Sequence, residues 1–326
     1  MTRVAVRELW LDGWRGASVL EVDGERVTYA GAPDATERVV PVTVLPGFVD
    51  SHVHLGLVDP RQLRGIARVL DLGWVPADAE RWLRHPDAAW PVVSIAGALI
   101  APVGGYPSAS EWAPPGATIE VETAQDAEAA VASMASRGAS VVKLTLNSVA
   151  GPVFDNTMLA AVIRAVHGAG LRAVVHAEGI GQAERAARAG ADLLAHAPFS
   201  ERLSDDVLAA MVGRCSWIST LDIHGWGSPT DEFHVAVDNV ARFHAMGGTV
   251  LYGTDLGNGP LPLGVNEREL RALEAAGLDE SAILRSLVGP LDTRLSVIDT
   301  PRTTDLPGWL ATATVRTPEQ LLKEHS

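Results

Sequence analysis

The stretch PGFVDSHVHL, residues 46–55, sets two histidines two positions apart in a largely apolar run. Side chains alternate between the two faces of a β-strand, so a strand here directs the imidazoles of His52 and His54 to the same face. Val53 and Leu55 then point the opposite way, toward packing helices. A single His-X-His pair more often packs or forms hydrogen bonds than binds a metal, so its role depends on the rest of the chain.

From this strand onward, short apolar runs alternate with stretches rich in Ala, Arg and Glu. Besides the run ending at His54, strands are predicted at residues 69–75, 92–100, 140–146, 172–176, 192–196, 217–221 and 249–252. Helices are predicted between them at residues 124–136, 156–167, 181–189, 205–212 and 234–246. Repeated strand–helix units imply a parallel sheet, and eight of them over about 250 residues predict a closed (β/α)8 TIM barrel. An open doubly wound sheet has the same local pattern and is the alternative.

The two ends of the chain have the pattern of a separate β unit. Residues 17–22 and 26–30 are short β-like runs separated by turn signals at Asp23-Gly24. Similar pieces return after Leu295, notably at residues 309–315. We therefore expect residues 1–43 and 296–326 to form a small β-sandwich-like unit, and residues 44–295 to form the barrel.

The composition indicates a globular chain whose net negative charge disfavours binding to polyanions. The sequence is 47% hydrophobic and only 20% charged, whereas disordered chains carry more charge and less apolar bulk. Its 26 basic and 40 acidic residues give a formal charge of −14, which argues against nucleic acid or an anionic membrane as a partner. We expect a small-molecule substrate instead, and leave open whether the chain forms a homo-oligomer.

The sequence favours a cytoplasmic location. Charged residues within the first twelve positions interrupt any apolar core of the length that a secretory signal needs. The uncharged stretch 88–110 is broken by several prolines and glycines, which a membrane-spanning helix tolerates poorly. The single cysteine, Cys215, excludes an internal disulfide.

Lys143 lies in the middle of the predicted buried strand at residues 140–146. Burial of a free ammonium is costly, so this side chain must lose its proton, meet an anion or be chemically modified. Alternatively, its apolar stem could extend to place the amine in solvent at the end of the strand.

Three further candidate ligands end predicted strands. His176 and His196 each close an apolar run immediately before a probable loop, and Asp255 follows the run at residues 249–252. Imidazole and carboxylate both suit zinc, manganese or iron, so the chemistry fits a transition-metal site. All three would emerge at the carboxyl-terminal mouth of a barrel, where barrel enzymes have their active sites.

The order of these residues resembles the amidohydrolase superfamily: His-X-His on the first strand, lysine on the fourth, histidines on the fifth and sixth, and aspartate on the eighth. The segments at 176–179, 189–192, 253–255, 269–270 and 276–278 resemble its imidazolonepropionase and Xaa-Pro dipeptidase branch. The sequence departs from that branch at residues 197–199 and near residues 287–291, so the bond that is cleaved stays open among amide, lactam, lactone and peptide-like C–N bonds.

The resemblance implies a metal-dependent hydrolase with two divalent metal ions, zinc being the expected metal. Lys143 would be carboxylated by CO2 and would bridge the ions together with a hydroxide. One ion would be held by His52, His54 and Asp255, and the other by His176 and His196. The catalytic residues would be Lys143 and Asp255, the latter carrying a proton to the leaving group.

Tyr106, His224 and Trp226 lie in predicted loops above the metals and are candidates for substrate contact, although aromatic loop residues often simply pack. Two other functions use the same pattern. A mononuclear deaminase of a cyclic amidine needs the same barrel, and a catalytically silent barrel could serve for binding. A dinucleotide site is disfavoured because Gly179 and Gly181 lack the third glycine of its motif.

Overall fold

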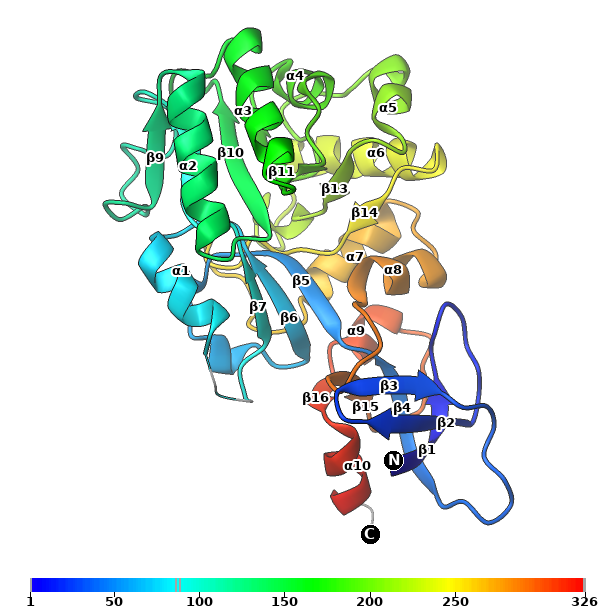
Figure 1. Cartoon of the computed structure of the whole chain (residues 1–326). Coiled ribbons are helices and arrows are strands. Elements are labelled where there is room, and N and C mark those ends of the chain that lie inside the picture. The colour runs from blue at the N-terminus through cyan, green and yellow to red at the C-terminus, as the bar shows by residue number, and fades with distance from the viewer. Residues whose placement is uncertain (1, 86, 88, 325–326) are drawn as a thin grey trace.

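The computed structural model describes residues 2–85, 87 and 89–324, and parallel β-strands form its centre (Figure 1). One sheet has the order β14-β13-β12-β11-β10-β8-β9, and a second has the order β5-β6-β7. Their strands are β5 (Phe48–Val53), β6 (Ile66–Asp71), β7 (Val92–Ile95), β8 (Leu99–Pro102), β9 (Thr118–Val121), β10 (Val141–Asn147), β11 (Arg172–Glu178), β12 (Leu193–Leu194), β13 (Ser216–Ile218) and β14 (Val250–Leu251). The predicted parallel α/β architecture is confirmed.

Backbone hydrogen bonds join the two sheets on both sides. The Ser140 N–H, just before β10, donates to the Ile95 carbonyl at the end of β7 over 3.0 Å. The Ser51 N–H in β5 donates to the Tyr252 carbonyl, just after β14, over 3.0 Å. The strands therefore curl around a shared interior.

Two strand boundaries differ from the sequence prediction. The run at residues 92–100 is divided into β7 and β8 because Gly97 between them adopts a left-handed backbone with φ +77°. The pattern predicts a strand at residues 69–75, but β6 spans Ile66–Asp71, since Gly73 (φ +145°) interrupts regular pairing. Strand β9, paired with β8, has no counterpart in the prediction.

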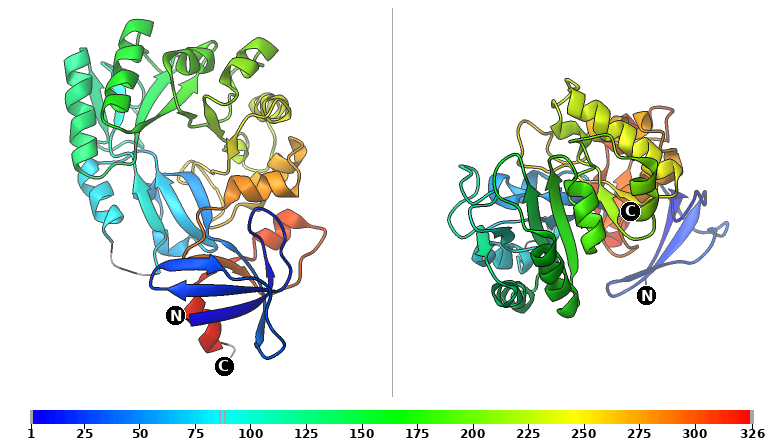
Figure 2. Two further views of the ribbon diagram at one scale, coloured as in Figure 1. Left: turned by 45° about the vertical axis from the view of Figure 1, so that its right-hand side comes forward. Right: turned by 90° about the horizontal axis from the view of Figure 1, so that it is seen from above.

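Helices cover the outer side of the curled sheets (Figure 2). The inward side of α3 buries Leu159, Val162 and Ile163, which share one core with Val142 and Leu144 of β10. The helices of this layer are α1 (Pro76–Leu83), α2 (Ala124–Ser136), α3 (Asn156–Gly168), α4 (Gln182–Ala189), α5 (Asp205–Met211), α6 (Asp231–Ala245), α7 (Glu267–Ala275) and α8 (Glu280–Leu287). None of the helices in the described part of the chain is both long and apolar enough to cross a membrane.

The interior enclosed by the strands holds a second, smaller apolar cluster, made of Leu72, Ala96, Val141, Val174, Leu193, Ala195 and Ile218. Every residue of β10 is buried, so both faces of this strand are covered. Lys143 stands two residues after Val141 and therefore projects to the same interior side, nearer the carboxyl end of the strand. The fold thus delivers a lysine into the interior directly above apolar packing.

The terminal segments form a six-stranded sheet beside the parallel strands (Figure 1), in the order β16-β15-β4-β1-β2-β3. It comprises β1 (Thr2–Leu9), β2 (Ser18–Asp23), β3 (Arg26–Tyr29), β4 (Val39–Pro46), β15 (Leu295–Ile298) and β16 (Thr314–Arg316). The C-terminal segment therefore does return to the N-terminal one, through antiparallel pairing of β15 with β4.

Two features of this terminal unit correct the sequence prediction. The described strands form one sheet rather than a sandwich, and helix α10 (Pro318–Glu324) covers its apolar face, with Leu321 packed among Val4 and Leu20. Within the predicted β-like run at 309–315, Trp309 lies in the helix α9 (Leu306–Leu310), because Asp305 caps a helical turn just before it.

Tyr252 links the last parallel strand to α7 through a hydrogen bond of its phenol oxygen. Removal of that oxygen tests the link. The buried Asn266 N–H donates to Tyr252 Oη over 2.7 Å, and both residues are fully buried. Tyr252→Phe leaves this N–H without a partner, so we expect the free energy of unfolding in urea to fall by about 1–3 kcal/mol. The matched change at the exposed Tyr29, Tyr29→Phe, should alter it by less than about 0.5 kcal/mol. Equal effects of the two substitutions would contradict this role.

Candidate metal centre

The end of β5 brings three potential ligands together. His52 Nε2 lies 3.1 Å from Asp255 Oδ1, and His54 Nε2 lies 3.3 Å from the same oxygen. All three side chains are buried, and one ligand atom from each lies within 4.8 Å of the others. This His-His-Asp group could hold a metal ion.

Each of three imidazoles is anchored through Nδ1. His52 Nδ1 lies 2.9 Å from the Ala195 carbonyl, His54 Nδ1 lies 3.0 Å from the Gly73 carbonyl, and His196 Nδ1 lies 2.9 Å from Thr220 Oγ1. An imidazole that donates its Nδ1 proton presents an unprotonated Nε2, which is the form that binds metals. Burial also lowers the pKa of His52 and of His196 well below 6.5, so both rings are neutral at pH 7.

Asp255 follows β14 and adopts a left-handed backbone, with φ +57°. While Oδ1 faces the two histidines, Oδ2 accepts a hydrogen bond from Asn258 Nδ2 over 2.9 Å. Burial by itself would raise the pKa of Asp255, but the neighbouring His52, His54 and His196 lower it well below 3.8. The carboxylate is therefore ionised and oriented.

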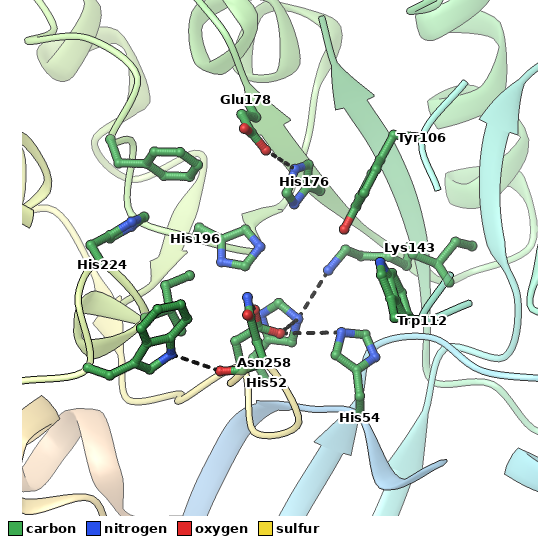
Figure 3. Close-up of a pocket in the computed structure, with 15 residues that line it drawn as sticks. His52, His54, Tyr106, Trp112, Lys143, His176, Glu178, His196, His224 and Asn258 are labelled. Atoms are coloured by element: carbon green, nitrogen blue, oxygen red, sulfur yellow. Dashed lines mark hydrogen bonds and ion pairs between the residues drawn. The ribbon is translucent and has the colours of Figure 1, made fainter. Parts of the chain in front are cut away.

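Lys143 reaches the same group from β10. Its side chain is 2% exposed, and Nζ lies 3.3 Å from His52 Nε2 (Figure 3). Burial lowers the pKa of Lys143 to about 8, against the opposing effects of Asp255 and Asp71. An amine whose cationic form is disfavoured by burial thus points at an imidazole nitrogen.

His176 and His196 lie beside this His-His-Asp group. Their ring centroids lie 4.8 Å apart, and that of His196 lies 4.8 Å from that of His52. His176 differs from the other rings because its Nε2 pairs with Glu178 Oε2 over 3.1 Å. Glu178 also accepts a hydrogen bond from Asn147 Nδ2 over 2.7 Å. Nδ1 is therefore the nitrogen that His176 has left for a ligand.

One cavity, of about 270 Å³, contains all nine residues singled out in the sequence. The six candidate ligands are joined there by Tyr106, His224 and Trp226, so no predicted site residue lies elsewhere. The sequence reasoning missed six further lining residues, namely Leu99, Trp112, Glu178, Phe199, Ile223 and Asn258. Glu178 and Phe199 lie two and three residues after candidate ligands, a signal that could have identified them.

Solved structures match the chain over nearly its whole length, although no protein-family model and no curated protein sequence matches it. A Xaa-Pro dipeptidase with methionine bound in its active site has a TM-score of 0.75 and 19% identity, over 97% of this chain and 98% of that one. A. niger ochratoxinase has a TM-score of 0.78 and 14% identity, over 97% of this chain and 94% of that one. Bottromycin amidohydrolase has a TM-score of 0.72 and 18% identity, over 99% and 88%. The chain has the amidohydrolase fold.

Within this amidohydrolase fold, a buried network supports the segment that follows β13. Glu269 of α7 accepts hydrogen bonds from the backbone N–H groups of Leu221 (2.9 Å) and Asp222 (2.7 Å). Asp222 in turn accepts from Arg268 Nε over 2.9 Å. This segment begins with Thr220, whose hydroxyl oxygen lies next to His196 Nδ1. It continues into Ile223 and His224, which line the cavity.

Burial of Glu269 makes the stability of the protein depend on pH. Burial raises the pKa of Glu269 from 4.5 to about 7, so the folded state holds this proton more tightly than the unfolded state. The resulting stabilisation is complete below about pH 4.5 and is lost as pH rises through 7, a change of about 3 kcal/mol. The free energy of unfolding of wild type and of Glu269→Gln is measured in urea, with chelator present, across this pH range. We expect the value for wild type minus the value for Glu269→Gln to fall by about 3 kcal/mol between pH 4.5 and 8. Parallel pH profiles would contradict the assignment.

Proposed function

We propose that the chain is a metal-dependent hydrolase of the amidohydrolase superfamily that cleaves an amide or a related acyl bond of a small molecule. The observation that carries the proposal is the convergence of the six candidate ligands, which are four imidazoles, one buried lysine and one carboxylate, on a single cavity. The names of the structural neighbours, which include a dipeptidase and an amidohydrolase, support the same class. Lactams and lactones are substrates of the same chemical type.

The architecture that we propose is a closed barrel of eight parallel strands. In it, β7 and β8 count as one strand interrupted at Gly97, and the bond from Ser51 to Tyr252 closes the circle. The barrel boundaries expected from the sequence, residues 44–295, move inward by a few residues, because β4 up to Pro46 and β15 from Leu295 pair in the terminal sheet. The site then lies at the carboxyl ends of the strands, which is the position of barrel active sites.

The donor set fits two divalent ions. We assign His52, His54 and Asp255 to one ion, and His176 and His196 to the other, with carboxylated Lys143 shared between them. The fit rests on nitrogen and oxygen donors that suit zinc and on imidazoles already fixed through their second nitrogen. Carboxylation turns the costly buried ammonium of Lys143 into an anion, which two adjacent cations would stabilise.

The metals would supply a nucleophilic hydroxide at neutral pH and polarise the substrate carbonyl. Asp255 takes the proton of the attacking water and passes it to the departing nitrogen, while Asn258 keeps its Oδ2 in position. Tyr106, His224 and Trp226 hold the substrate and exclude water from the reacting atoms.

The chain has two lysines, Lys143 and Lys323. Substitution of each one, followed by measurement of the metal content, tests whether metal binding depends on Lys143 in particular. Elemental analysis of protein purified without chelator should find about two ions per chain. Lys143→Met should lose at least one of them, because the shared ligand is gone. The matched Lys323→Met should keep both.

Labelled bicarbonate supplies the control for lysine modification. Protein reconstituted with metal and ¹³C-bicarbonate should show one carbamate carbon by NMR in wild type and in Lys323→Met, and none in Lys143→Met. A single ion that is unaffected by Lys143→Met would favour a mononuclear deaminase. No ion, even after addition of metal, would favour a barrel that only binds.

Asp255→Asn tests proton transfer. We expect kcat on the best substrate from a panel of amides, lactams and lactones to fall by about a hundredfold to ten-thousandfold, because the amide accepts no proton. The matched surface change Asp59→Asn, which affects the pair with Arg61 and the cap of a short turn, should leave kcat unchanged. Full activity of Asp255→Asn would rule out this role.

A further inference from the structure

The side chains that line the candidate metal centre include carboxylates but almost no basic groups. Among the described residues that line the cavity, the carboxylates are Asp255 and Glu178, and there is no arginine. The only lysine is Lys143, which lies at the bottom among the candidate ligands. The nearby Arg268 lines a different pocket, where it pairs with Asp222 over 2.8 Å. Above the ligands, the cavity therefore offers no cation to a substrate.

His224 does not replace the missing cation. Its ring packs against Phe199, with centroids 4.4 Å apart. Burial lowers the pKa of His224 to about 4, so the ring is neutral at pH 7. It can form a hydrogen bond with a substrate, but it contributes no positive charge.

Aromatic rings form two opposing walls of the cavity. Tyr106 and Trp112, whose centroids lie 6.2 Å apart, stand on one side of the histidines, and His224 stands on the other (Figure 3). Trp226 belongs to the wall of His224 and is held by a hydrogen bond from its Nε1 to the Asn258 carbonyl, over 3.0 Å. Aromatic rings pack favourably against flat apolar groups, and their weakly negative faces disfavour a nearby anion.

A second cavity continues past the first wall and shares five lining residues with it. This space, of about 290 Å³, is bordered by Tyr106 and Trp112 and is completed by Leu57 and two glycines. It adds no basic residue from the described part of the chain. A group that extends from a carbonyl at the candidate metal centre would enter a space lined by these two rings, Leu57, His54, Asn258 and the carboxylate of Asp255, with no lysine or arginine.

We propose that the substrate of this site is an amide whose group remote from the cleaved bond is uncharged and aromatic, with no free carboxylate. The inference rests on the hydrolase function proposed above. A free dipeptide would bring its terminal carboxylate between ring faces and close to Glu178, with no basic partner. Loss of water from an unpaired carboxylate is costly, and carboxylate-binding sites normally supply arginine or lysine.

Matched pairs of compounds test the proposal. Each pair has the same aromatic amide and differs only in a terminal carboxamide or carboxylate, as in 4-acetamidobenzamide and 4-acetamidobenzoate, or N-acetylphenylalaninamide and N-acetylphenylalanine. We expect the metal-loaded enzyme to favour the neutral member by at least about tenfold in kcat/KM and in affinity measured by calorimetry. Equal or better use of the carboxylates would overturn the proposal.

Two substitutions of Trp226, which is 42% exposed, test whether the cavity wall determines the preference for neutral substrates. Trp226→Arg places a cation on the wall, and Trp226→Gln removes the ring without adding charge. The ratio of neutral to carboxylate affinity should fall at least about fivefold in the arginine variant relative to the glutamine variant. Because Trp226 lines the first cavity, the same ratio in both variants would show that charge in this cavity does not set the preference, and would contradict the proposal.

The binding measurement separates failure of this inference from failure of the proposed function. If no amide is hydrolysed but the neutral members bind more tightly, the hydrolase proposal fails and the substrate preference stands. If amides are hydrolysed and the carboxylates are preferred, the function stands and the preference is wrong. Binding of neither member of any pair would also overturn the preference.

Discussion

The buried carboxylate of Asp50 joins the first and the last of the parallel strands, and the geometry of the candidate metal centre depends on it. Its Oδ1 accepts hydrogen bonds from the backbone of His52 (3.1 Å) and of Thr254 (3.0 Å), a residue 204 positions later in the chain. Oδ2 accepts from the Thr254 hydroxyl over 2.6 Å. Because His52 and Asp255 are attached to the two segments that Asp50 connects, this side chain acts together with backbone bonds such as that from Ser51 to Tyr252 to fix the distance between two candidate ligands from opposite ends of the fold.

The sequence predicts the candidate ligands well because each one depends on local pattern. His52, His176 and His196 stand at the ends of apolar runs, and in a parallel sheet such positions meet at one edge. Lys143 is identifiable because a lysine in a buried strand needs a special environment. The structure brings these residues to one cavity, while their role as ligands remains a prediction.

The sequence identified Tyr106, His224 and Trp226 in the cavity wall but not the other wall residues. Trp112 and Asn258 lie in connections whose paths follow from contacts with distant segments, and no periodicity marks them. The terminal β unit shows the same limit. Pairing of β15 with β4 follows from apolar strands at both ends, but its form as one sheet covered by α10 depends on the docking of Leu321, which strand patterns do not encode.

Backbone strain in the described chain gathers around the cavity. Of the non-glycine residues with positive φ, Thr220, Trp226 and Asp255 all lie at or beside it, and only Asp12 lies elsewhere. The conformation of Thr220 (φ +44°) is the most costly, because a branched side chain fits the left-handed region poorly. It persists because Thr220 N–H donates to the Gly253 carbonyl over 3.0 Å and the next two N–H groups are bound by Glu269. The buried network of α7 thus offsets the strain that directs the Thr220 hydroxyl to His196 and turns the following segment toward the cavity wall.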